Sequence, residues 1–125
     1  MGRENKVIGA VGEKIAHAFL KKKGYRLVAS NYRTPLGEID LIARKGSALV
    51  FVEIKTRTTS SLGPPFLSVT WKKQRHIVMT ALMYLKKYGL LDSDWRVDVV
   101  SVKLNKRYEV ENIEIIENAV EDVYY

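Results

Sequence analysis

Two short runs of charged residues stand in segments that are otherwise rich in Ile, Val, Leu and Phe. The first run holds Glu38 and Asp40, and the second holds Glu53 and Lys55, with twelve residues between Asp40 and Glu53. Both segments have the pattern of β-strands, in which alternate side chains point to the same face. The two carboxyl groups of the first run therefore share a face, and Glu53 shares a face with Lys55. Such a set can hold a hard divalent cation and act on a water molecule.

The turn between these strands decides whether the two runs meet. In an antiparallel hairpin, the numbers of paired residues have a constant sum. A short turn around residues 45–47 allows a sum of 91 or 93, which puts Asp40 and Glu53 on the same face, whereas an even sum separates them. With the odd sum, two carboxylates and Lys55 converge at mid-sheet among apolar neighbours.

Charges buried at this position need partners, because each isolated ion loses several kcal/mol of solvation. Oxygen ligands from Asp40 and Glu53, with the main-chain carbonyl of Ile54, suit Mg²⁺ or Mn²⁺, which also bind phosphate oxygens. Lys55 would orient or deprotonate a water, or stabilise the charge that develops on a phosphate. The alternative is a salt bridge between Glu53 and Lys55 on a solvated edge strand. The matching parity of Asp40 and the basic charge of the chain favour the metal site.

Glu13 lies in a helical pattern beside the small residues Gly9, Gly12 and Ala16. These would let the helix approach the sheet closely and leave a carboxylate facing inward. The alternative is a surface glutamate four residues before His17.

Gln74 falls inside the apolar stripe of a second helical pattern, three residues after Trp71 and four before Val78. A buried amide needs hydrogen-bond partners. Two interpretations stay open: Gln74 caps a carbonyl of the core, or it contacts Lys55, a water at the metal or a phosphate.

The charge of the chain is strongly basic and unevenly distributed. The 125 residues include 21 Lys and Arg and 14 Asp and Glu, which gives a net charge of +7. The last 18 residues, 108–125, include six acidic residues and no basic one. Clustered Lys and Arg favour a polyanionic partner such as nucleic acid, although solvated surface charge is the alternative for each residue. Arg57 is the first choice as a phosphate contact, because it follows Lys55 by two residues. The other candidate phosphate contacts also lie near strand or helix ends and are Arg33, Arg44, Lys72, Lys73, Arg75 and the lysines at 21–23.

Periodicity predicts the order α-β-β-β-α-β-β. Helices are expected over residues 2–23 and 69–88, with Gly24 and Gly89 as stops, and strands over 25–33, 37–44, 48–56, 95–104 and 108–116. The first three strands should form an antiparallel meander, and the crossover through the second helix should make the next pair parallel. The result is an α/β fold with a mixed sheet and helices packed on it. Residues 58–68 are predicted to form a mobile loop.

Composition limits the other classes of protein. With 46% hydrophobic and 28% charged residues, the chain is expected to form one globular domain over residues 1–125. The absence of cysteine excludes disulfides and thiolate chemistry and is typical of a cytoplasmic protein. We expect no membrane partner, because no apolar run approaches the length of a span. Asp98, between Val97 and Val99, is expected to pair with Arg96 or with a buried basic group for structure. The two histidines are too few and too separated for a zinc site.

These motifs together resemble a known family. The spacing of Asp40, Glu53 and Lys55 looks like the PD-(D/E)XK core of restriction-endonuclease-like nucleases, with Ile39 in place of the proline. The wider pattern resembles the YraN-like family of small uncharacterised bacterial proteins over nearly the whole chain, on the motifs Gly12-Glu13, Asn31-Tyr32-Arg33, 37–42, 51–57, Lys73-Gln74 and 96–100. The resemblance implies a restriction-endonuclease-like fold and a nuclease similar to archaeal Holliday junction resolvases. It also implies that Glu13 is a third acidic ligand.

The sequence therefore predicts a Mg²⁺- or Mn²⁺-dependent endonuclease that hydrolyses DNA, with Asp40 and Glu53 as ligands, Glu13 assisting and Lys55 activating water. Selectivity for branched or junction DNA is implied only by the resemblance. The alternatives are an inactive nucleic-acid-binding adaptor of the same fold and a structural protein whose charged cluster is a salt-bridge network. DNA is the expected partner rather than RNA. The oligomeric state stays open, with a homodimer through the 58–68 loop or the edge of the third strand as one alternative.

Overall fold

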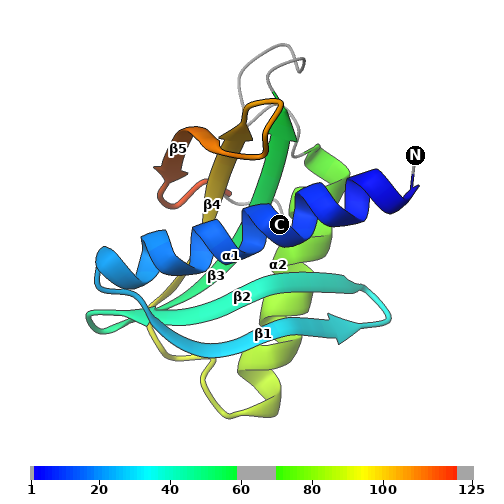
Figure 1. Cartoon of the computed structure of the whole chain (residues 1–125). Coiled ribbons are helices and arrows are strands. Elements are labelled where there is room, and N and C mark those ends of the chain that lie inside the picture. The colour runs from blue at the N-terminus through cyan, green and yellow to red at the C-terminus, as the bar shows by residue number, and fades with distance from the viewer. Residues whose placement is uncertain (1, 59–69, 121–125) are drawn as a thin grey trace.

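The computed structural model of the chain describes residues 2–58 and 70–120 (Figure 1). The elements follow the predicted order and are α1 (Gly2–Lys22), β1 (Arg26–Thr34), β2 (Gly37–Lys45), β3 (Ala48–Thr58), α2 (Trp71–Lys87), β4 (Trp95–Leu104) and β5 (Val110–Ile116). The α/β fold class is thereby confirmed.

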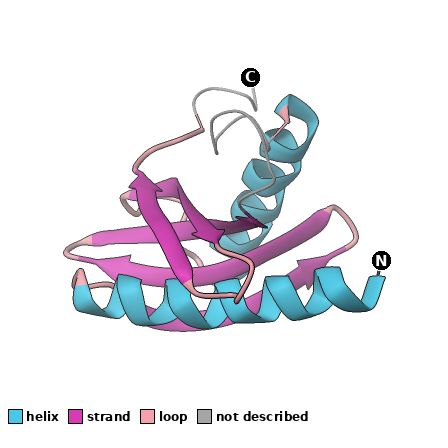
Figure 2. Cartoon of the chain, turned by 45° about the horizontal axis from the view of Figure 1, so that its top comes forward, coloured by secondary structure: helices cyan, strands magenta, loops and turns pink. Residues whose placement is uncertain are grey.

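The five strands form one mixed sheet in the order β1-β2-β3-β4-β5. The pairs β1–β2, β2–β3 and β4–β5 are antiparallel, and β3–β4, which the crossover through α2 connects, is parallel. The helices cover opposite faces: α1 crosses in front of the sheet in Figure 1 and α2 lies behind it, and Figure 2 shows α1 running along one side of the strands. Both the meander and the parallel pair are as predicted.

Element boundaries differ from the sequence prediction by one or two residues at several ends, and two of these differences have a clear consequence or cause. Residue 58 belongs to β3 rather than to the predicted 58–68 loop, and the rest of that loop lies outside the described residues. The last strand begins at Val110 rather than at 108, because Asn105 closes a turn by accepting hydrogen bonds from the main-chain N–H groups of Arg107 and Glu109 at 2.8 and 3.0 Å. Tyr108 in this turn has a φ of 62°, which no strand allows.

Each helix buries a separate apolar cluster against its face of the sheet. The β3 residues alternate between the two clusters: Leu49 and Phe51 pack on the α2 side, whereas Val50 and Val52 pack on the α1 side. By the same alternation, Glu53 points toward α2. This arrangement brings the first turn of α2 to the charged part of β3.

Gly12 sets the distance between α1 and the sheet. A Cβ atom at this position would lie 1.7 Å from the Oγ1 atom of Thr56 in β3. Only glycine allows the helix backbone to come this close. The prediction that small residues let α1 approach the sheet is confirmed at Gly12, which brings the next residue, Glu13, beside β3, but not at Gly9, where an added Cβ atom would meet nothing within 4 Å.

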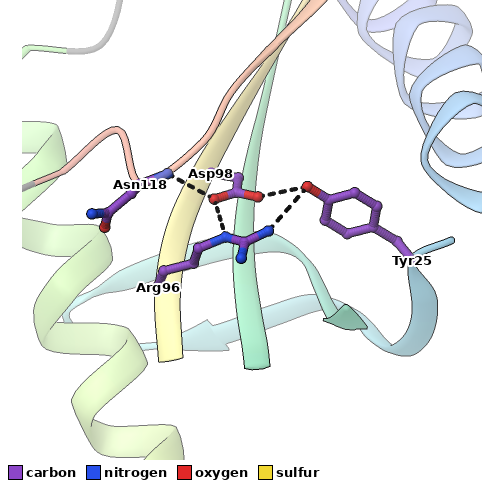
Figure 3. A network of polar contacts seen from close by, with 4 residues as sticks. All are labelled: Tyr25, Arg96, Asp98 and Asn118. Carbon is purple, nitrogen blue, oxygen red and sulfur yellow. Dashed lines mark hydrogen bonds and ion pairs between the residues drawn. The ribbon is translucent and has the colours of Figure 1, made fainter. Parts of the chain in front are cut away.

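A buried polar network ties the end of α1 to β4 (Figure 3). The carboxylate of Asp98 is fully buried and accepts hydrogen bonds from the Tyr25 hydroxyl at 2.8 Å, the Arg96 Nε at 2.9 Å and the Asn118 main-chain N–H at 2.9 Å. Arg96 also donates to the Tyr25 oxygen at 3.3 Å. Burial, followed by the hydrogen bond to the Asp98 carboxylate, raises the pKa of Tyr25 to about 12. The expected pairing of Asp98 with Arg96 is confirmed.

No helix within residues 2–58 and 70–120 is long and apolar enough to cross a membrane.

Candidate active site

The β2–β3 ladder ends where the charged residues begin. Its paired residues have a sum of 93, as predicted, and the last pair is Leu41 with Val52. Beyond that point β2 pairs with β1 alone and β3 pairs with β4 alone. Asp40 fills the opening with its side chain, because its Oδ2 atom accepts a hydrogen bond from the main-chain N–H of Ile54 at 2.8 Å. A carboxylate thus replaces the backbone pairing between two central strands.

The carbonyl of Ile54 faces the same opening. In a β-strand the N–H and C=O of one residue point toward the same neighbouring strand. Since the Ile54 N–H donates to Asp40, its carbonyl oxygen also points toward β2, at a position where the ladder has ended. Two carboxylates and a main-chain carbonyl, all hard oxygen donors, therefore border one gap.

Glu53 is nearly inaccessible, with 4% of its surface exposed. Its Oε1 atom lies 3.2 Å from the Nζ atom of Lys73 on α2. Burial, followed by the charge of Asp40, raises the pKa of Glu53 from 4.5 to about 8, against the opposing effect of Lys73. A single ammonium group therefore does not balance the two carboxylates in this environment.

The surroundings shift the pKa values of the two lysines of the site, Lys55 and Lys73, in opposite directions. Burial, and then the neighbouring Lys73 ammonium, lower the pKa of Lys55 below 10.5. Burial also disfavours the charged form of Lys73, but the Glu53 carboxylate, the contact with Lys55 and the charge of Asp40 together outweigh it and raise the pKa of Lys73. Lys73 is thus the cation that holds Glu53, and Lys55 is the amine more easily made neutral.

The charged residues line an open cavity of about 530 Å³. Its lining includes Glu53 and Lys55 from β3, Lys73 from α2, Asp40 from β2 and Glu13 from α1. A smaller cavity of about 210 Å³ adjoins it through Glu53 and Lys73. Burial, and then the charge of Asp40, raise the pKa of Glu13, which places its carboxylate in the field of the site.

Glu13 lies at the cavity but is not grouped with Asp40 and Glu53 as a set of three ligands. Among the side chains that the structure describes, no three His, Cys, Asp or Glu residues are grouped so as to hold a metal ion. Glu13 comes from the helix on one face of the sheet, whereas Glu53 points to the other face and is paired with Lys73 there. The role of Glu13 as a third ligand therefore stays a prediction.

The candidate phosphate contacts divide into two groups. Arg33 lines the cavity and pairs with Glu38 at 3.4 Å. Arg57 is half-buried on β3, two residues after Lys55, and Lys72 and Arg75 are exposed in the first two turns of α2. Arg44 lies elsewhere, because its charge acts on Tyr84 in the second half of α2.

Lys73 has a role that sequence reasoning missed. It was expected to contact phosphate, but it pairs with buried Glu53 and lines the cavity. Its spacing to Ile77, Thr80 and Tyr84 follows the 3.6-residue period of the buried face of α2, which is the signal that distinguishes it from Lys72. Gln74 is half-buried beside it, and its predicted contact with the site stays a prediction.

A larger cavity of about 650 Å³ lies between α1 and the β1–β2 hairpin. Its lining is mainly apolar with a basic rim that includes Lys14, Lys21 and Arg26, and none of its described lining residues is a carboxylate. The carboxylates and lysines that could carry out chemistry therefore line the cavity of about 530 Å³ and not this one.

Comparisons with known proteins agree with the wider motif pattern. The sequence profile described as "Uncharacterised protein family UPF0102" matches residues 12–102. Similar proteins, each named "UPF0102 protein", include one from Alkaliphilus metalliredigens, 45% identical over 87% of this chain and 96% of its own length. Another from Geobacter metallireducens is 43% identical over 99% of this chain and 100% of its own length.

A solved structure, that of Pyrococcus furiosus SfsA in complex with Ca²⁺, is 16% identical with a TM-score of 0.40. The match covers 94% of this chain and 65% of that chain. This degree of similarity does not establish a shared fold.

Proposed function

The chain belongs to the uncharacterised protein family UPF0102, as its YraN-like motifs predict, and we propose that it is a divalent-metal-dependent nuclease that hydrolyses DNA phosphodiester bonds. One observation carries the proposal: the buried carboxylate of Glu53 and the carboxylate of Asp40 meet at the open end of the β2–β3 ladder, with Lys55 beside them in a solvent-accessible cavity. The restriction-endonuclease-like character of the fold belongs to the same proposal.

The donor set fits Mg²⁺ or Mn²⁺. Asp40, Glu53 and the Ile54 carbonyl supply hard oxygen atoms. Burial, and then the charge of Asp40, raise the pKa of Glu53, and a bound cation would favour its charged form. One or two protein carboxylates usually hold such a cation, since the remaining positions go to water and substrate phosphate. A bound cation would polarise the phosphodiester and offset its developing negative charge.

Lys55 is the residue we assign to proton transfer at the attacking water. Lys55 lines the same cavity as Glu53, and its lowered pKa increases the fraction of neutral amine that can accept a proton. In its charged form the same group stabilises negative charge on phosphate. Lys73 has a positioning role, because its ion pair at 3.2 Å fixes the Glu53 carboxylate.

The basic surface supports a polyanionic substrate. The first turn of α2 has no acidic residue, and Arg57 follows Lys55 along β3. Lys and Arg at these positions gain affinity for phosphates by releasing counterions. DNA that is branched or forms junctions is the substrate that we propose to test first.

An inactive nucleic-acid-binding adaptor is the second candidate function, and the Glu53–Lys73 ion pair favours it. An internal ammonium can hold a buried carboxylate without any metal ion. In that case the basic surface would bind nucleic acid while the charged cluster stabilised the fold.

A cleavage experiment separates the two functions. The parent protein, Asp40→Asn and Lys55→Met would be incubated with labelled four-way junction, flap, single-stranded and duplex DNA, with Mg²⁺ or Mn²⁺ and with chelator. Asp92→Asn serves as the matched control, because it removes one carboxylate in the exposed turn before β4. We expect metal-dependent cleavage by the parent and the control, and none by the other two variants. Cleavage by Asp40→Asn at the parent rate would contradict the site, and binding without cleavage by the parent would favour the adaptor.

A further inference from the structure

The first turn of α2 exposes a large aromatic ring beside positive charge. Trp71 has 62% of its surface exposed. The Cζ atom of Arg75, one helical turn later, lies 5.8 Å from the centre of the indole ring. Lys72 is exposed between them, and no acidic residue occupies the first turn. Arg75 covers one face of the ring, and the exposed fraction means that much of the remaining surface is open to solvent.

Trp71 lies close to the candidate active site without entering it. Lys73, two residues later, pairs with Glu53 at 3.2 Å. Successive residues of an α-helix are rotated by about 100°, so Trp71 and Arg75 share one side of α2 and Lys73 points to roughly the opposite side. With a helix about 10 Å across, the indole lies about one helix width from Glu53.

We propose that Trp71, supported by Arg75, is a stacking platform for an unpaired nucleobase in a single-stranded segment of nucleic acid. This proposal adds to the proposed function the kind of substrate, a nucleic acid with unpaired bases. It rests on the proposed function in one respect only, namely that the partner is a nucleic acid. An aromatic ring next to cationic side chains binds single strands because the bases stack on the ring while their phosphates meet the charges. A fully paired duplex keeps its bases stacked inside and cannot use the ring.

The position of the platform indicates which nucleotide it binds. Because Trp71 and Lys73 lie on opposite sides of α2, the stacked base belongs to a nucleotide a short distance along the strand from the phosphate at Glu53. The platform therefore contributes to binding and not to the chemical step. Loss of the ring should raise KM for substrates with unpaired bases and leave kcat unchanged.

A binding experiment in chelator tests the platform independently of cleavage. Fluorescence anisotropy would measure the affinity of the metal-free protein for labelled oligothymidylate and for a duplex of equal length. Trp71→Ala should weaken oligothymidylate binding about 5-fold or more, and leave duplex binding unchanged. Trp71→Phe should retain most of the affinity, because it keeps an aromatic face.

Tyr88→Ala is the matched control, because Tyr88 is an exposed aromatic residue at the other end of α2 with Lys87 over its ring at 5.5 Å. It should bind oligothymidylate like the parent. Unchanged oligothymidylate binding by Trp71→Ala, or an equal loss for both DNAs, would overturn the platform, as would failure of the parent to bind oligothymidylate. Absence of cleavage in the nuclease experiment would count against the proposed function and leave the binding result unaffected.

Discussion

The substitution Glu53→Gln should stabilise the metal-free protein, and more so at high pH than at low pH. Folding raises the pKa of Glu53 from 4.5 to about 8, mainly through burial and then through the charge of Asp40. A carboxyl group with a raised pKa keeps in the native state a proton that it has released in the unfolded chain. Its contribution to stability therefore falls as the pH rises from about 4.5 to about 8, and is constant above that.

The size of the effect follows from the shift. At about 1.4 kcal/mol per pKa unit, the rise to about 8 corresponds to roughly 5 kcal/mol between the ends of this range. Glu53 has only 4% of its surface exposed, so solvent screening does not reduce the figure substantially. Glutamine is neutral at every pH and has nearly the same shape, so it removes the penalty and keeps the packing.

Urea unfolding of the parent and of Glu53→Gln at a series of pH values between 4 and 9 measures the effect. The difference in free energy of unfolding should be small at the acidic end, grow in favour of the glutamine variant, and level off above about pH 8. Added Mn²⁺ should stabilise the parent at pH 8 and above and have no such effect on the variant. A stability difference that is independent of pH, or that grows toward acid, would refute the reasoning about Glu53.

Three further substitutions test how the site is supported. Asp98→Asn should cost about 1–3 kcal/mol in urea unfolding, because it removes the charge of a fully buried carboxylate that pairs with the half-buried Arg96 guanidinium; a loss below about 1 kcal/mol would contradict the role of the network. Gly12→Ala should lower the melting temperature, because the new Cβ atom would overlap the Oγ1 atom of Thr56. Adding Thr56→Ala to the same chain should recover part of this loss. If the effects of the two substitutions on stability simply add, α1 does not pack on β3 at this point. Thr70→Ala should cost about 1 kcal/mol, because the Thr70 side chain caps α2 by accepting from the Lys73 N–H at 3.2 Å; unchanged thermal stability would mean that the cap is not formed.

The sequence predicted the elements of the fold well, because periodicity and turn residues act locally. The register of β2 and β3 also followed, since a short turn permits few pairings and an even sum would have turned Glu53 away from Asp40. The sequence could not show that the ladder stops at Leu41 and Val52. That ending depends on Asp40 accepting the Ile54 N–H, a contact between a side chain and a distant main chain.

The partner of Glu53 was the least predictable part of the site. Lys72, Lys73 and Arg75 are chemically similar, and only the angular position on α2 decides which of them meets the sheet. Trp71 was assigned to the apolar face of the helix, but 62% of its surface is exposed, because the rotation of about 100° per residue turns it away from the side that carries Lys73. Glu13 shows the same limit, since the close contact at Gly12 brings it to the cavity but does not determine what it contacts there.

The claim that Asp40 and Glu53 together hold a divalent cation can be tested most directly without any DNA. Calorimetric titration of the parent and of Asp40→Asn with Mn²⁺ at pH 8.5 measures this binding independently of the choice of substrate. We expect the parent to bind Mn²⁺ and Asp40→Asn to bind it at least about 10-fold more weakly while remaining folded. Equal binding by the two proteins, or no binding by the parent, would mean that Asp40 and Glu53 do not form a metal site.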